Sequence, residues 1–304
     1  MNLVFHTCDV FTNRAFAGNP LAVIPEAAGL NTRQMQAIAS EFNLSETVFM
    51  LPPADPRHDL RLRIFTPSTE LPFAGHPTVG AACMLAHLGR VSVADNTVDV
   101  LVEEAVRTLP VSIRRTGEHC YFAQFSAPRG ADYFDPAPSI EDIATVLSLD
   151  PLRICTDRNP PRIVSCGVPF LCVEVTGLTE MRAIHVNTAH WTDRLGGADA
   201  PSIYVFTRET LNDDCHLHVR SFPFNLGIAE DSATGSAATA LGGYLGDTAS
   251  VVSGTLTYRL EQGFEMNRPS LIDIEIDRHD GRTTAIRVGG ESVPIMQGTL
   301  TFPD

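Results

Sequence analysis

The sequence predicts an α/β fold, with α+β character, in two pseudo-symmetric domains. Short runs rich in β-branched residues outnumber the stretches with helical periodicity. Their order repeats in the second half of the 304-residue chain, and a loop rich in Pro, Gly and Asp at 127–138 separates the halves. A period near half the chain length indicates two similar domains rather than a solenoid of short repeats.

In the first half, β-branched or alternating runs bounded by Gly, Pro or Asn predict strands. These strands are expected at 3–11, 21–24, 47–51, 60–65, 98–102, 109–113 and 120–125. Helical periodicity runs from Thr32 to Phe42, after Asn31 as a candidate N-cap, and from Pro77 to Leu88. Proline suits the first turn of a helix, so Pro77 marks a helix start.

The second half repeats this order of elements. Strands are expected at 163–165, 171–175, 203–207 and 217–220, and helices at 187–195 and 233–245. A shift of 156 positions brings Thr78 onto Thr234 and places Asp231 opposite Gly75. Several matches share this offset, which predicts an internal duplication; chance similarity between two αβ units is the alternative.

Composition excludes several classes of protein. The sequence is 44% hydrophobic and 19% charged, which is normal for a folded globular chain. It has no run of about 20 apolar residues that would span a membrane. A net charge of −14 disfavours nucleic acid as a partner, because phosphates would be repelled. No signal peptide is visible, so a cytoplasmic location is expected.

The residue types also limit the cofactors. Lysine is absent and all 22 basic residues are arginine. This excludes a Walker-type phosphate loop, and it excludes a Schiff base with pyridoxal phosphate unless the N-terminal amine substitutes. No glycine-rich dinucleotide motif opens a helix. The seven cysteines form no Cys-x-x-Cys pair, so free thiols are expected rather than a disulfide framework or a zinc site. We therefore expect neither a cofactor nor a metal ion.

Each half contains a loop that leads into a helix of small residues. In the first loop, Gly75 lets the backbone approach a ligand closely, and His76 is either a loop histidine or a hydrogen-bonding and proton-carrying group. In the second loop, Asp231 or Ser232 is either a helix N-cap or a site residue. If both helix N-termini face one cleft, their dipoles favour a substrate carboxylate there.

Glu46 is a third candidate, at a junction between a helix and an apolar strand. Burial at the start of that strand would raise the pKa of its carboxyl toward a value useful for acid–base catalysis. From composition alone, a surface carboxylate at a strand start is the simpler interpretation.

Four motifs, in order along the chain, resemble the PhzF family of phenazine-biosynthesis-type isomerases. They are residues 16–23 (FAGNPLAV), 43–46 (NLSE), 71–77 (LPFAGHP) and 230–236 (EDSATGS). The resemblance spans nearly the whole chain. It implies a diaminopimelate epimerase fold, in which each domain is a β-barrel-like sheet around a central helix, and it implies a homodimer. The expected domains are 1–127, completed by a C-terminal strand at 286–304, and 128–285.

The resemblance also implies roles for individual residues. Glu46 becomes the proton shuttle, and His76 and Asp231 become auxiliary catalytic groups. Substrate binding is implied for the residues beside them, namely Ser45, Gly75, Gly235 and Ser236. Related epimerases carry a cysteine in each half, at positions corresponding to Gly75 and Asp231. Neither is cysteine here, so racemisation by two thiols is not expected.

Three functions are compatible with these features. The first is a cofactor-independent isomerase, resembling the one that acts on trans-2,3-dihydro-3-hydroxyanthranilate, in which Glu46 takes a proton from one carbon and returns it to another. The second is a racemase, epimerase or isomerase of another small amino or hydroxy acid. The third is a binding protein without catalytic activity. The expected partner is a small carboxylated molecule, not nucleic acid or a membrane.

Overall fold

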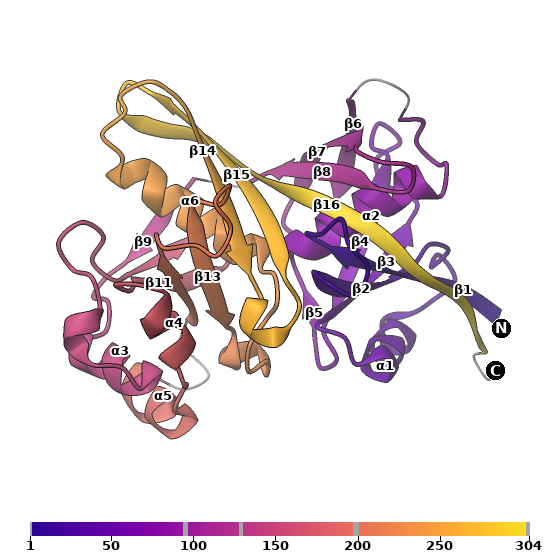
Figure 1. Cartoon of the computed structure of the whole chain (residues 1–304). Coiled ribbons are helices and arrows are strands. Elements are labelled where there is room, and N and C mark those ends of the chain that lie inside the picture. Colours follow the sequence, from indigo (N-terminus) through magenta and orange to yellow (C-terminus); the bar gives the residue numbers. More distant parts are fainter. Residues whose placement is uncertain (1, 94–96, 128–129, 197–200, 302–304) are drawn as a thin grey trace. The chain divides into compact units, whose positions relative to one another are not determined.

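The chain divides into two compact units, each folded around its own central helix (Figure 1). The computed structural model describes residues 2–93, 97–127, 130–196 and 201–301. The first unit comprises Met1–Pro128 and Arg287–Asp304, and the second comprises Arg129–Ile286. The chain returns from the second unit to the first at Ile286–Arg287, inside the long strand β16 (Arg282–Thr301). Within the described ranges, no helix is both long and apolar enough to cross a membrane.

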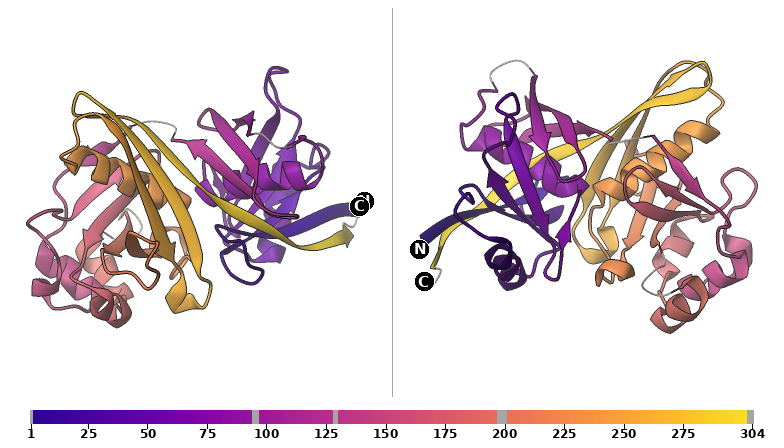
Figure 2. Two further views of the ribbon diagram at one scale, coloured as in Figure 1. Left: turned by 45° about the horizontal axis from the view of Figure 1, so that its top comes forward. Right: turned by 180° about the vertical axis from the view of Figure 1, so that it is seen from behind.

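In the first unit, eight strands form a closed barrel. Their order around the barrel is β1 (Asn2–Val10), β2 (Asn19–Ile24), β3 (Glu46–Leu51), β4 (Leu60–Phe65), β6 (Val98–Glu103), β7 (Thr108–Arg115), β8 (Tyr121–Ser126) and β16. The barrel closes because β1 pairs with β2 on one side and with β16 on the other, so that Asn2 lies opposite Thr301. Figures 1 and 2 show β16 running alongside β1. A short strand, β5 (Glu70–Leu71), adds to β4.

The helix α2 (Gly75–His87) is the centre of the first unit. Every residue from Gly75 to Ala86 is buried, as the resemblance implied for a central helix. Small side chains allow this because strands approach the helix on several sides. At Gly80, an added Cβ would lie 2.5 Å from Leu21 Cδ2 and 2.7 Å from Val10 Cγ2.

We expect Gly80→Val to lower the unfolding free energy by about 1–3 kcal/mol, because Val10 and Leu21 are fully buried and have little room to move. Urea unfolding followed by circular dichroism measures the change. Gly29→Val is the control, since an added Cβ there meets no atom within 4 Å, and it should stay within about 0.5 kcal/mol of wild type. Equal stability of the two variants would contradict this picture of α2.

The helix α1 (Thr32–Phe42) places Glu46 at the start of β3. It begins with the expected cap: Asn31 accepts a hydrogen bond from Gln34 N–H, and the Gln34 side chain accepts one from Asn31 N–H. It ends at Asn43, whose left-handed backbone (φ 50°) turns the chain back toward the barrel. Met35, Ile38 and Ala39 pack in the hydrophobic core on this side of the sheet, as the helical spacing predicts. Their neighbours in this core include Leu3, Ile24, Phe49 and Phe65.

The second unit repeats this plan around α6 (Gly235–Thr248). Its sheet has the order β15 (Ser270–His279), β14 (Gly254–Gln262), β13 (Leu217–Phe222), β12 (Ser202–Thr207), β11 (Pro169–Glu174), β10 (Arg162–Ser165) and β9 (Asp132–Phe134). The unit also contains three helices, α3 (Ile140–Leu147), α4 (Leu178–Ala183) and α5 (Thr188–Leu195). Short 3-10 turns lie at Pro151–Arg153, Phe224–Leu226 and Phe264–Met266. A hydrophobic core from Ile143 to Phe222 lies between α3, α4, α5 and the sheet.

The structure corrects one feature of the sequence-based prediction here. The loop expected at 127–138 contains β9, because Asp132–Phe134 pairs with β10. Residues 128–129 of that loop lie outside the described residues. All seven cysteines are free thiols, as expected.

Two polar contacts repeat in both units and support an internal duplication. Glu103, at the end of β6, accepts two backbone N–H bonds from the loop before β4 and lies 2.7 Å from His58 Nδ1. Glu261, in β14, accepts two backbone N–H bonds from the loop before β13 and lies 2.7 Å from His218 Nδ1. The pairings of β4 with β6 and of β13 with β14 place these glutamates at equivalent positions.

The second repeated contact is an arginine–glutamate pair. Arg63 in β4 binds both carboxylate oxygens of Glu70, at 2.7 and 2.6 Å. Arg220 in β13 binds both oxygens of Glu230, at 2.8 Å each. Each guanidinium also lies over the ring of the phenylalanine two residues later in its strand. Contacts of this detail are not expected from chance similarity between two αβ units.

The number of residues that separates equivalent positions of the two units changes along the chain, so the single predicted offset of 156 is wrong. An offset of 156 holds for β3 and β12, but the loop after β13 is longer than the loop after β4, and α2 and α6 begin 160 positions apart. Gly75 therefore corresponds to Gly235. Asp231 corresponds to Leu71, because Ser221 bridges Asp231 as Ile64 pairs with Leu71. The predicted equivalence of Gly75 and Asp231 is wrong.

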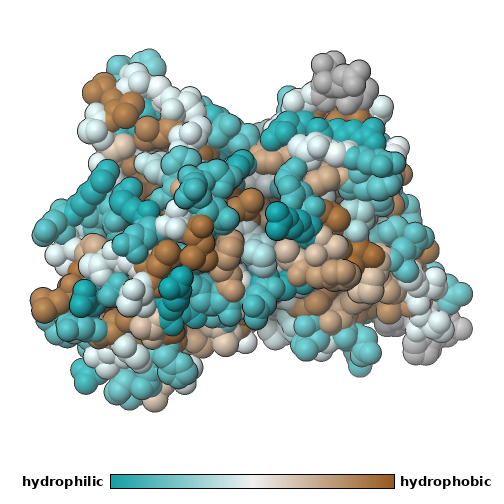
Figure 3. Space-filling model, in the orientation of Figure 1, coloured by the Kyte–Doolittle hydropathy of each residue, from teal (hydrophilic) through white to brown (hydrophobic). Residues whose placement is uncertain are grey.

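Hydrophobic and hydrophilic residues are intermixed over the face of the molecule shown in Figure 3. Among the exposed large apolar residues, Phe16 and Leu152 expose most of their side chains, at 75% and 86%. Phe16 lies in the 16–23 motif and has a left-handed backbone, with φ 68°.

Candidate active site

The first unit brings Glu46, His76 and Asn19 together. Glu46 opens β3 and is 8% exposed, so the interpretation as a surface carboxylate is wrong. His76, the second residue of α2, is also buried, and its Nε2 lies 3.4 Å from Glu46 Oε2. Asn19, the first residue of β2, places its Nδ2 3.4 Å from His76 Nδ1. The two motifs that contain Glu46 and His76 therefore meet at one carboxyl–imidazole pair.

The contact between Glu46 and His76 joins a carboxyl group to a neutral imidazole. Burial lowers the pKa of His76 to about 3, so the ring carries no charge at neutral pH. Asn19 Nδ2 can only donate, so His76 Nδ1 accepts and the ring hydrogen is assigned to Nε2, which faces Glu46. A neutral N–H donor of this kind can orient a carboxylate without competing for its proton.

We expect His76 to remain neutral, with its hydrogen on Nε2, from pH 5 to pH 8. Nitrogen-15 NMR of labelled histidine, assigned with His76→Gln, measures both the charge and the tautomer. Free histidine in the same buffer provides the reference spectrum for a titrating imidazole. A protonated His76 at pH 6 would contradict the assignment.

Ser45 and Gly75 lie beside this pair. Ser45 is half-buried and directly precedes Glu46. Gly75 is the buried first residue of α2, and Thr78 N–H makes the first backbone hydrogen bond of the helix, to Ala74 O. The N–H groups of a first helical turn have no partner within the helix, so the α2 N-terminus offers donors and a positive dipole end to an anion.

The second unit holds Asp231 next to the start of α6. Asp231 is 7% exposed, and its Oδ2 accepts a hydrogen bond of 2.5 Å from Thr234 Oγ1. The N-cap of α6 is Thr234, so the alternative in which Asp231 or Ser232 caps the helix is wrong. Gly235 is the buried first residue of α6, and Ser236 is half-buried beside it.

Several polar residues at these two clusters were not singled out from the sequence. Asn19 lies in the 16–23 motif, and its place between Gly18 and Pro20 was the available signal. Thr234 lies in the 230–236 motif. Gln262 and Tyr204 also contact the Asp231 cluster, but they come from strands β14 and β12, and only the fold brings them there.

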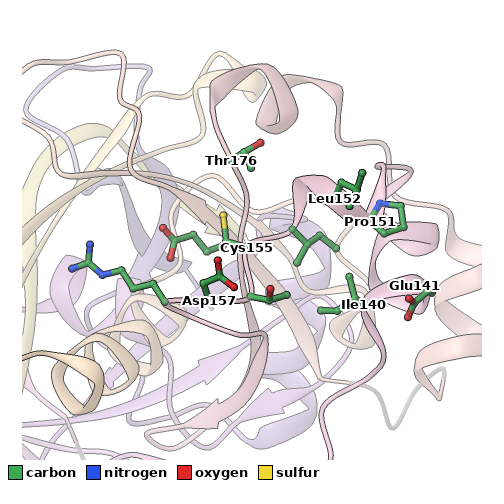
Figure 4. Close-up of a pocket in the computed structure, with 11 residues that line it drawn as sticks. Ile140, Glu141, Pro151, Leu152, Cys155, Asp157 and Thr176 are labelled. Atoms are coloured by element: carbon green, nitrogen blue, oxygen red, sulfur yellow. The ribbon is translucent and has the colours of Figure 1, made fainter.

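A separate pocket of about 620 Å³ opens within the second unit (Figure 4). Its wall includes Cys155, Asp157 and Glu174, and burial raises the pKa of the Cys155 thiol, which makes that thiol a poor nucleophile. None of the predicted site residues lines it. Over the described parts of the chain, histidine, cysteine and carboxylate side chains do not gather in groups of three or more that could hold a metal ion.

Comparison with known proteins agrees with the motifs. A family model described as phenazine biosynthesis-like protein, PhzC-PhzF, matches residues 8–298. The chain belongs to the PhzF family. This confirms the family that the four motifs indicated.

Several relatives of this PhzF-family chain are named isomerases. It is 39% identical to an uncharacterized isomerase of Mesorhizobium japonicum, with 96% of each chain covered. It is 30% identical to the trans-2,3-dihydro-3-hydroxyanthranilate isomerase of Pseudomonas aeruginosa, covering 95% of this chain and 96% of that one.

Solved structures confirm the predicted fold. A PhzF-family phenazine biosynthesis protein of Bacillus anthracis matches with a TM-score of 0.89 and 24% identity, over 99% of this chain and 100% of that one. A hydroxyproline epimerase of Agrobacterium vitis matches with a TM-score of 0.65 and 12% identity, over 100% and 93%. The PhzF-family chain therefore shares its fold with an epimerase as well as with another PhzF-family protein.

Proposed function

We propose that this chain is a cofactor-independent isomerase that moves a proton, and with it a double bond, on a small carboxylated substrate. The proposed substrate is trans-2,3-dihydro-3-hydroxyanthranilate or a close analogue, as in the relative of Pseudomonas aeruginosa. Glu46 takes a proton from one carbon as the base and returns it to another carbon as the acid.

The observation that carries the proposal is the buried pair of Glu46 and neutral His76, with no comparable pair at the equivalent positions of the second unit. Glu46 corresponds to Ser202, and His76 corresponds to Ser236. A serine is a poor acid or base at neutral pH. Racemases with two acid–base groups need a proton carrier from each half, whereas a single carrier suffices for a shift between two carbons on one side of a substrate.

The other residues have supporting roles in this proposal. His76 orients the Glu46 carboxyl through its Nε2 hydrogen and stays neutral throughout the reaction. The backbone N–H groups at Gly75 and Gly235 bind substrate oxygens, because helix N-termini favour anions. Ser45, Ser236 and Asp231 hold the remaining polar groups of the substrate.

The test is to incubate the protein with trans-2,3-dihydro-3-hydroxyanthranilate in D₂O and to follow double-bond migration by absorbance and deuterium by NMR. We expect isomerisation, with deuterium at the carbon that receives the proton to the extent that protonated Glu46 exchanges with D₂O between the two transfers. The same assay on a panel of small amino and hydroxy acids tests the alternative of racemisation, which predicts deuterium at a stereocentre without a shifted double bond. No turnover on either would favour the binding protein without catalytic activity.

A further inference from the structure

The side chain of Gln262 lies beneath the start of α6 and is fully buried. Its Nε2 lies 2.8 Å from Asp231 O and 3.1 Å from Thr234 Oγ1. Its Oε1 lies 3.2 Å from Thr234 N and 3.1 Å from the Tyr204 hydroxyl. An amide side chain has two hydrogens and two lone pairs, and here all four have partners.

Counting hydrogens fixes the direction of every bond in this network. Thr234 N–H can only donate, so the atom that faces it must be Gln262 Oε1, and Gln262 Nε2 is the donor to Asp231 O and to Thr234 Oγ1. Thr234 Oγ1 accepts that bond and has one hydrogen of its own. This hydrogen points to Asp231 Oδ2, 2.5 Å away, where it stabilises an ionised carboxylate.

We propose that Thr234 and Gln262 are positioning residues, which hold Asp231 as an oriented carboxylate. This inference rests on the proposed function for the role of Asp231 in substrate binding. Neither residue needs to contact the substrate, since both act through Asp231. The network lies in the buried part of the second unit, so its geometry does not depend on solvent.

The equivalent position in the first unit has a different chemistry. The strand pairings make Glu104 the counterpart of Gln262. Glu104 Oε1 lies 2.5 Å from Thr78 Oγ1, and Thr78 Oγ1 lies 2.7 Å from Ala74 O. A hydroxyl has one hydrogen; if Thr78 gives it to Ala74 O, Glu104 must be protonated and donate to Thr78. Burial raises the pKa of Glu104 to about 8, in agreement with a neutral acid.

This contrast explains why an amide, and not an acid, occupies position 262. A carboxyl group there would either ionise and repel Asp231, or stay protonated with one hydrogen for the two acceptors that Gln262 Nε2 serves. Both outcomes weaken the hold on the Asp231 carboxylate. Glu104 has no acidic residue in the equivalent place, because Leu71 corresponds to Asp231.

The test combines a readout that needs no substrate with one that does. Carbon-13 NMR of labelled aspartate, assigned with Asp231→Asn, gives the pH midpoint at which Asp231 takes up a proton. We expect this midpoint to rise in Thr234→Val and in Gln262→Glu, and to return to the wild-type value in Thr234→Ser, which keeps the hydroxyl. With trans-2,3-dihydro-3-hydroxyanthranilate, kcat/KM should fall about tenfold to hundredfold in the first two variants, the size of one hydrogen bond to a charged group.

Glu104→Gln is the matched control at the equivalent position of the other unit. Its amide can still donate to Thr78, and it lies in the other unit, so the Asp231 midpoint should stay at the wild-type value. The acidic limb of the kcat/KM profile should move with the Asp231 midpoint, which a purely structural role would not cause. An unchanged midpoint in folded Thr234→Val and Gln262→Glu would overturn the proposal. If wild type does not turn over the diene acid, the proposed function fails, and the NMR midpoint alone still decides this inference.

Discussion

Replacing Glu46 with glutamine should lower kcat/KM for trans-2,3-dihydro-3-hydroxyanthranilate by about 10²–10⁴-fold, because the amide can neither accept nor return a proton. Glutamine has nearly the same shape, so it can keep the position beside His76 Nε2, which lies 3.4 Å from Glu46 Oε2. The buried start of β3 should therefore keep its structure. Steady-state kinetics with purified protein measure the loss, and deuterium incorporation in D₂O should disappear together with turnover.

The matched control for this prediction is Glu41→Gln. Glu41 lies five positions before Glu46 and is exposed on α1. Its substitution removes the same charge without changing the buried pair. Its kcat/KM should equal that of wild type. Full activity in Glu46→Gln would remove the proton carrier from the mechanism, even if the wild-type protein isomerises the diene acid.

The sequence predicts the elements whose pattern is local. The helix α1 has its cap at Asn31 and its apolar stripe within eleven residues, and both appear where expected. The strands β14 and β15 were not predicted, although the alternation of apolar and polar residues in Ser270–His279 is typical of a half-buried strand. The helix α3 was not predicted, although Ser139 caps it, because it follows directly on a segment rich in proline and glycine.

The candidate site illustrates the same limit. Motifs identify Glu46 and His76, but their contact depends on β3 and α2 meeting inside one barrel, which no local pattern specifies. The register of the repeat failed for a related reason. Insertions in the loop after β13 change the offset between the halves, and only strand pairing shows that Gly75 matches Gly235.

The repeat also separates the scaffold from the chemistry. The contacts that hold the loops, such as Glu103 and Glu261, are the same in both units. The acid–base candidates differ: Glu46 corresponds to Ser202, and Asp231 corresponds to Leu71. The two carboxyl groups therefore occupy non-equivalent positions, which favours a reaction in which they have unequal roles over a symmetric two-carrier racemisation.

The largest effect on stability is expected for His218→Ala, which should lower the unfolding free energy of the second unit by about 3–5 kcal/mol at pH 7. His218 is fully buried between two carboxylates, with Nδ1 2.7 Å from Glu261 and Nε2 3.0 Å from Glu265. Removing the imidazolium leaves both carboxylates without their cation. Urea unfolding measures the loss, and His58→Ala is the control: His58 contacts one carboxylate, Glu103, and both side chains are partly exposed, so a smaller loss is expected.

The difference between wild type and His218→Ala should depend on pH in a defined direction. Burial alone would lower the pKa of His218, but hydrogen bonds and charge from Glu261 and Glu265 outweigh burial and raise that pKa to about 9. The unfolded value is near 6.5, so the stabilisation is complete below about pH 6.5 and is lost as pH rises through about 9. Unfolding free energies of both proteins between pH 6 and pH 10 should therefore converge on the alkaline side. A gap that stays constant over this range would mean that His218 stabilises the unit by packing, and not as a cation between two carboxylates.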